Sequence, residues 1–199
     1  MKPTEDIWID RWSLKTLISS AIEVYPRETM GLLWGTSRQR KFEGKKRKVL
    51  SVKSVYPVQT ADRKYTKVGW GPDMAKERLL NSVKGLNIGV LGEYNSHTRT
   101  PSSAHLSPDD HEYYENEIYF GRNILGKDWI ELLIRINEKD NKSNKSSIRS
   151  KYTYQKAERF LIDLPPRTYD LTLSGWFIES SDDEISSRKG TVWIDWPIR

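Results

Sequence analysis

The stretch Leu91-Gly92-Glu93-Tyr94-Asn95-Ser96-His97 decides the interpretation of this sequence, because it leads from an apolar run into a window that holds all three histidines of the chain. The run 88–91 predicts a buried strand that enters the window. Ser107 and Pro108 predict the N-cap and first position of a helix that leaves it. A strand ending in histidine, followed by a helix that begins with carboxylates such as Asp110, can bring imidazole and carboxylate to one metal ion. Zinc accepts both kinds of ligand, and a catalytic zinc site uses three of them and a water.

The composition predicts one soluble domain with a core rich in aromatic residues. The chain has 199 residues, eight Trp and ten Tyr, and 36% hydrophobic residues. Cysteine is absent, so disulfides and thiolate metal sites are excluded, and any zinc must be held by His, Asp or Glu. We see no signal peptide and no apolar run of the roughly 20 residues that span a bilayer. We therefore expect a cytoplasmic protein with no membrane partner.

The charge is basic, with a formal net charge of +6 and a pI of about 9.3. Seven basic residues lie in the segment 38–48, where Glu43 is the acidic interruption. We interpret this segment as a solvated connection between two strands. A nucleic-acid surface is the alternative, and we rank it low because no nucleic-acid-binding motif is present.

The periodicities predict helices interleaved with strands early in the chain and mostly strands later. We expect helices at 11–24, 71–84 and 108–120, strands at 30–35, 49–58, 86–94, 129–136, 169–178 and 191–196, and an exposed loop at 138–150. The first helix has Asp10 as its cap and an apolar stripe that includes Trp12 and Leu17. Residues 152–164 fit a strand or a helix. This pattern predicts an α/β or α+β fold with a mixed sheet.

The motifs resemble those of the JAMM (MPN-domain, JAB) zinc metalloproteases. The family pattern E-x-x-G-x-L-x-G is matched by Glu28-Thr29-Met30-Gly31-Leu32-Leu33-Trp34-Gly35. The pattern G-x-x-H-[ST]-H-P is matched by the segment 92–98, except that Asn95 and Thr98 replace the first histidine and the proline, and S-x-x-D is matched by Ser107 to Asp110. The resemblance covers roughly residues 11–138. It implies a mixed sheet flanked by helices, like that of cytidine deaminases, over residues 1–138, and we assign residues 139–199 to a β-rich C-terminal extension of the same domain.

The histidine motif can be aligned in two registers. In the first, Asn95 and His97 occupy the two histidine positions, and the loop before Ser107 is two residues longer than usual. We prefer this register because residues at i and i+2 of a strand face the same way. In the second, His97 and Arg99 occupy those positions and the loop has its usual length. His105 is a further candidate ligand, whereas His111 lies about 100° around the helix from Asp110.

The resemblance assigns a role to each matched residue. It implies that His97, Asp110 and, in the histidine position, Asn95 hold Zn²⁺, that Glu28 is the general acid/base, and that Ser107 stabilises the oxyanion. The implied reaction is hydrolysis of an amide or isopeptide bond in a protein or peptide, for example one formed by a ubiquitin-like modifier. An amide oxygen is a weaker zinc ligand than imidazole, so we expect an impaired metal site. The alternative function is a catalytically inactive protein-binding scaffold, a pseudoenzyme.

Overall fold

The structure is a computed structural model and describes residues 6–42, 45–59, 61–64, 68–69, 75–82, 89–98, 112, 129–141, 145–153, 156–181 and 184–195. Two helices lie within these ranges, α1 (Arg11–Val24) and α2 (Ala75–Ser82). The strands are β1 (Asp6–Asp10), β2 (Met30–Phe42), β3 (Lys45–Pro57), β4 (Asp62–Arg63), β5 (Val68–Gly69), β6 (Gly89–Thr98), β7 (Trp129–Asp140), β8 (Ser147–Thr153), β9 (Lys156–Leu164), β10 (Arg167–Ser181) and β11 (Glu184–Asp195).

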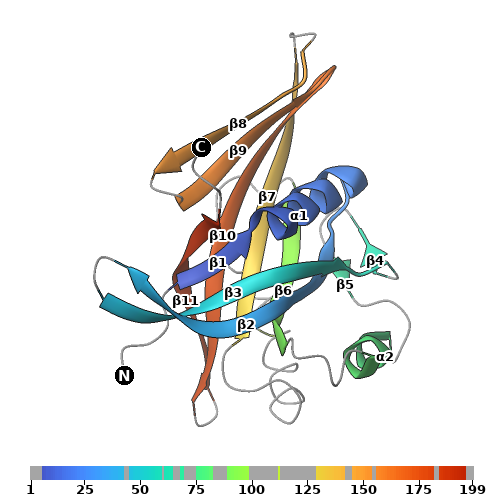
Figure 1. The fold of residues 1–199 in the computed structure, drawn as a ribbon. Coiled ribbons are helices and arrows are strands. Elements are labelled where there is room, and N and C mark those ends of the chain that lie inside the picture. The colour runs from blue at the N-terminus through green and yellow to red at the C-terminus, as the bar shows by residue number, and fades with distance from the viewer. Residues whose placement is uncertain are drawn as a thin grey trace.

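Nine of these strands form one sheet in the order β11-β1-β3-β2-β6-β7-β10-β9-β8, and β11 also pairs with β10. This second pairing closes seven strands into a barrel, from which β9 and β8 continue beyond β10 (Figure 1). Strand β1 runs parallel to both of its neighbours, and β6 runs parallel to β7. The closed sheet therefore joins the N-terminal strand to the C-terminal one.

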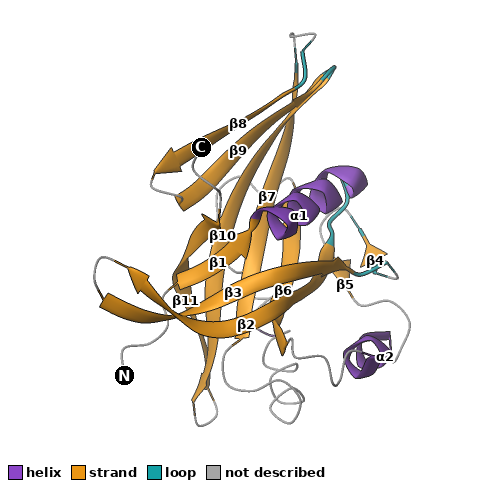
Figure 2. Cartoon of the chain, viewed as in Figure 1, coloured by secondary structure: helices purple, strands orange, loops and turns teal. Residues whose placement is uncertain are grey.

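This architecture corrects the fold that the sequence predicted. We expected an α/β or α+β fold of JAMM type, with helices flanking a mixed sheet, whereas the described residues are mostly strand and the sheet closes on itself (Figure 2). The expectation failed partly because β1, which has only five residues, was not recognised as a strand. Its pairing with β11 joins residues that are far apart in the chain, which no local periodicity reports.

Two segments that we interpreted as connections also belong to strands. β2 extends to Phe42 and β3 begins at Lys45, so most of the basic segment 38–48 forms a long hairpin. β7 extends to Asp140 and β8 begins at Ser147, so the predicted loop 138–150 is wrong at both ends. In both places polar and charged side chains lie on exposed parts of strands, and their composition resembles that of a loop.

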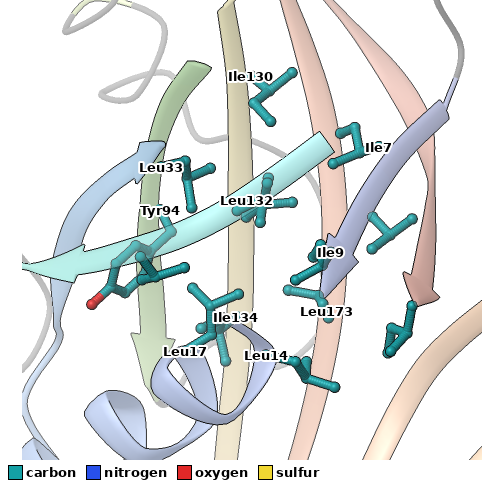
Figure 3. Close-up of a cluster of buried hydrophobic side chains, with 14 of the residues drawn as sticks. Ile7, Ile9, Leu14, Leu17, Leu33, Tyr94, Ile130, Leu132, Ile134 and Leu173 are labelled. Atoms are coloured by element: carbon teal, nitrogen blue, oxygen red, sulfur yellow. The ribbon is translucent and has the colours of Figure 1, made fainter. Parts of the chain in front are cut away.

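The core fills the inside of the barrel, and alternation along each strand decides which residues enter it. Along β7, the side chains of Ile130, Leu132, Ile134 and Ile136 all belong to the buried cluster. Figure 3 shows several of these side chains converging with others from β1, β2 and β10. Because successive residues of a strand point to opposite faces, the residues between them lie on the face of the sheet that is turned away from this cluster. We call this face of β2, β6, β7 and β10 the outer face.

Helix α1 is confirmed as predicted, from its first residue to its last. The Asp10 carboxylate accepts hydrogen bonds from the backbone N–H groups of Trp12 and Ser13, at 2.8 and 2.9 Å, and so caps the helix. Leu14 and Leu17 point into the core cluster (Figure 3). Trp12 departs from the predicted apolar stripe, because it is 62% exposed beside the cationic side chains of Arg11 and Lys15.

The second half of the predicted histidine window lies outside the described residues. The helix expected at 108–120 falls there, apart from the helical residue Glu112. The helix expected at 71–84 is described as α2 over Ala75–Ser82. Neither of the two described helices is long and apolar enough to cross a membrane.

Candidate functional site

The candidate site lies where β2 begins and β6 ends. These antiparallel strands pair Met30 with Asn95, Gly31 with Tyr94 and Leu32 with Glu93. Continuing this register beyond Met30 sets Thr29 opposite Ser96 and Glu28 opposite His97. Two residues widely separated in the sequence thereby become cross-strand neighbours.

Hydrogen bonds show that the pairing continues beyond Met30. The Ser96 N–H donates to the Thr29 carbonyl at 2.8 Å, and the Thr29 N–H donates to the Ser96 hydroxyl at 2.9 Å. Farther along, the Thr98 hydroxyl donates to the Pro26 carbonyl at 3.0 Å. On its other side, the Glu28 N–H donates to the carbonyl of Lys64 at 3.0 Å. The backbone of Glu28 is therefore held between β6 and the end of β4.

The side chains on this part of β6 divide between the two faces. Tyr94 points inward and is fully buried, and its hydroxyl lies 3.1 Å from that of Ser20 on α1. Burial raises the pKa of the Tyr94 hydroxyl above its ordinary value of 10.0, although the hydrogen bond with Ser20 opposes this shift. Since Tyr94 points inward, its neighbours Glu93 and Asn95 and the next alternate residue, His97, point outward.

The outer face carries a polar group that extends over three strands. Parallel pairing of β6 with β7 sets Glu93 beside Glu131 and His97 beside Arg135. The row Glu28, His97, Arg135 therefore crosses β2, β6 and β7. Asn95, His97 and Arg135 are half-buried, whereas Glu28, Glu93 and Glu131 are buried. Solvent thus reaches this row at His97 and Arg135.

Three members of this group, Glu93, Glu131 and Arg135, were not among the predicted site residues. Residues 129–136 were predicted as a strand, and its two charged residues were assigned no role. Glu131 and Arg135 are four residues apart, so they share one face of a strand. That spacing is a local signal that could have placed both of them on the outer face.

Asn95 has the one amide side chain at the candidate site. Its Oδ1 atom is buried and has no hydrogen-bond partner among the residues that the structure describes. A buried acceptor without a donor is unfavourable, so this oxygen is suited to a group that the described residues do not supply. Such a group can be a metal ion or an N–H of a ligand.

The described residues fit part of a zinc site. His97 offers an imidazole, Asn95 offers its buried oxygen, and Glu28 lies across from His97 as a candidate base. A catalytic site needs three protein ligands, and within the described ranges no three His, Cys, Asp or Glu side chains are grouped closely enough to hold a metal ion. The predicted ligand Asp110 and the predicted oxyanion partner Ser107 lie outside the described residues, as do Arg99, His105 and His111.

Comparisons with known proteins do not assign a family to this chain. No family model matches it, and no curated protein matches it. One solved structure that superposes on it is that of protein DSY2949 from Desulfitobacterium hafniense, determined in solution. The TM-score is 0.49 and the sequence identity is 16%, over 95% of this chain and 92% of that chain. A likeness at this level supports no conclusion about function.

Proposed function

We propose that this protein is a zinc-dependent hydrolase of amide or isopeptide bonds, with the metal site weakened by Asn95. The observation that carries the proposal is the register of β2 and β6, which sets Glu28 opposite His97 on the outer face. The motif resemblance pairs the same two residue types as base and metal ligand. The correction of the fold leaves this argument in place, because it rests on two neighbouring strands and not on helices that flank the sheet.

In this proposal His97 and Asn95 hold the metal ion together with Asp110. Zinc, when bound, supplies the Lewis acidity that lets water attack an amide near neutral pH. Glu28 takes a proton from the attacking water and delivers it to the leaving amine. Its buried position keeps competing bulk water away from this transfer. Ser107 donates a hydrogen bond to the oxyanion that forms on the amide carbon.

Zinc content tests the metal site. We expect the purified protein to bind zinc weakly, and Asn95→His to bind it at least about 10-fold more tightly, because imidazole replaces a neutral oxygen. His97→Ala should abolish binding in both backgrounds. The measurement is metal content by mass spectrometry after dialysis against a graded series of chelator concentrations. Absence of zinc from both the wild type and Asn95→His would refute the proposal.

Activity tests the base. With two ubiquitin-like proteins joined by an isopeptide bond as substrate, Asn95→His should cleave faster than the wild type. Adding Glu28→Gln to this variant should leave its zinc content unchanged and remove cleavage, because the amide cannot accept the proton. Equal cleavage with and without Glu28→Gln would exclude Glu28 as the base.

We keep the non-catalytic scaffold as a second candidate function. One observation favours it: Asn95 occupies the position of the first histidine of the family motif. Its neutral amide oxygen is a weaker zinc ligand than imidazole. A protein that binds the isopeptide-linked substrate with zinc removed, and whose Asn95→His variant gains zinc without cleavage, would fit this alternative. The cytoplasmic location expected from the sequence stays a prediction.

A further inference from the structure

Arg135 occupies the outer face directly beside His97, on the side opposite to Glu28. Its β7 neighbours Ile134 and Ile136 belong to the core cluster, so Arg135 points the other way. Its register partners are His97 on β6 and Thr172 on β10, neither of which is an acid. The row across the three strands therefore consists of a carboxylate, an imidazole and a guanidinium.

The guanidinium of Arg135 lacks part of its hydrogen bonding. Its Nε atom is buried and has no hydrogen-bond partner among the described residues. The nearest acid diagonally along this face, Asp170, is already occupied. It accepts hydrogen bonds from Arg159, with Nε to Oδ1 at 2.7 Å, and from Lys139 at 3.3 Å. The register neighbours of Arg135 therefore offer its Nε no free carboxylate, and a carboxylate of a bound ligand could fill this place.

The pair formed by Arg159 and Asp170 shows what such a partner looks like. There Nε and Nη2 of one guanidinium donate to the two oxygens of one carboxylate. This fork geometry makes arginine selective for planar carboxylates. Arg135 carries the same guanidinium group on the outer face, and its buried Nε has no hydrogen-bond partner among the described residues.

We propose that Arg135 binds the free C-terminal carboxylate of a peptide substrate, so that among the amide bonds covered by the proposed function the site prefers the last one of a chain. This rests on the proposed function, because it names the substrate of the same site. Neighbouring strands are about 4.8 Å apart, so the backbones of Glu28 and Arg135 lie roughly 10 Å apart on either side of His97. An extended arginine side chain spans much of that distance. An amide near Glu28 and His97 can then be one residue away from a carboxylate on Arg135.

The reaction balances with water as the only co-reactant. Water adds to the carbonyl carbon of the last amide, the C–N bond breaks, and the leaving amine takes the proton that Glu28 carried. The products are the shortened chain, with a new carboxylate, and one free amino acid. Arg135 binds the carboxylate of that amino acid throughout and takes no part in proton transfer. Arg135 is therefore a specificity-determining residue.

A binding assay without metal separates this inference from the zinc proposal. The probes are acetyl-alanyl-alanine, the same dipeptide with a C-terminal amide, and acetyl-glutamyl-alanine amide, whose one carboxylate is on the side chain. Binding is measured by ligand-observed NMR with chelator present, so that zinc cannot hold the carboxylate. We expect the free acid to bind about 10-fold more tightly than either amide, as for other charge-assisted pairs.

Variants then assign the preference to Arg135. Arg135→Ala should bind all three probes equally, and Arg135→Lys should keep part of the preference, because lysine keeps the charge but loses the fork. The matched control is Arg188→Ala, which removes another half-buried strand arginine, one whose guanidinium lies 4.7 Å from the ring centre of Phe177. It should leave the preference unchanged. Circular dichroism checks that each variant is folded.

Four results would overturn the inference, and the first three concern the free acid. They are no detectable binding of the free acid at millimolar concentrations, equal affinity for the acid and its amide in the wild type, and a preference that survives Arg135→Ala. Tighter binding of the side-chain carboxylate would exclude the chain terminus in the same way. The wild-type comparison needs no variant, so it decides the question even if Arg135→Ala does not fold. Failure of the zinc measurement affects none of these outcomes.

Discussion

Removing the hydroxyl of Tyr94 should destabilise the protein measurably without touching the outer face. Tyr94 is fully buried inside the barrel, and its hydroxyl lies 3.1 Å from that of Ser20. The Ser20 hydroxyl also donates to the carbonyl of Leu17 at 3.0 Å. In Tyr94→Phe, Ser20 therefore keeps one bond, and we expect a loss of about 1 kcal/mol in the free energy of unfolding, the usual value for one buried hydrogen bond.

The reciprocal change, Ser20→Ala, should cost about 1–2 kcal/mol, because it removes the serine from both bonds and takes a partner from the buried tyrosine hydroxyl. The double variant should cost less than the sum of the two, with a coupling energy of at least about 0.5 kcal/mol. Ser19→Ala is the matched control. Its hydroxyl donates to the Thr16 carbonyl at 3.2 Å on the exposed side of the same helix, and its loss should be within about 0.5 kcal/mol of zero.

Urea unfolding followed by tryptophan fluorescence measures the free energy of unfolding of the wild type and of the four variants. If Tyr94→Phe and Ser20→Ala add without coupling, or if Ser20→Ala behaves like Ser19→Ala, the bond between helix and barrel contributes nothing and the reasoning is refuted. Binding of acetyl-alanyl-alanine should be unchanged in Tyr94→Phe, because the substitution keeps the ring that fills the core. A change in binding would show that this interior bond also positions Asn95 and His97.

Two further predictions concern stability. Gly92→Ala should lower the free energy of unfolding by at least about 2 kcal/mol, because the new Cβ would lie 1.8 Å from the Ile130 carbonyl oxygen. Gly69→Ala is the control and should be nearly neutral in the same urea assay, because no atom lies within 4 Å of its new Cβ. Equal losses of stability in the two variants would contradict this account of the contact between β6 and β7. Hydrogen bonding from Arg159 holds the pKa of Asp170 below its ordinary value of 3.8, so the stabilisation is present above that value and is lost as the pH falls through the lower pKa of the folded state. Asp170→Asn should therefore cost about 1 kcal/mol near neutral pH, and its difference from the wild type should narrow in acid, whereas a constant difference across pH would show that charge is not the cause.

Local signals in the sequence predicted the elements that depend on neighbouring residues. Both ends of helix α1 were predicted correctly, because its apolar spacing and its cap at Asp10 involve only residues that are close together in the sequence. The strand that became β6 was predicted from its apolar run, although the structure begins it three residues later and extends it to Thr98. These features require no knowledge of the rest of the chain.

Closure of the barrel depends on contacts that the sequence does not report locally. β1 has five residues, and it is fixed by parallel pairing to β3 on one side and to β11 on the other. The hairpin of β2 and β3 carries basic side chains where it extends beyond the closed part of the sheet, so its composition resembled that of a loop. A polar strand and a polar loop differ in hydrogen bonding to a partner strand, and that partner is known only after folding.

At the candidate site, the pairing of Glu28 with His97 does not depend on the fold class that the sequence predicted. The motif with Glu28 and the motif with His97 lie on two strands that are adjacent in the sheet, and the antiparallel register alone sets the two residues opposite each other. That geometry is the same whether the sheet is open and covered by helices or closed as a barrel. Arg135 joins the row through the parallel register of β6 with β7, which depends on the overall topology. The motifs alone therefore could not place Arg135 beside His97. The carboxylate preference that we infer for Arg135 depends on this position, so the binding assay tests a feature that only the three-dimensional structure provides.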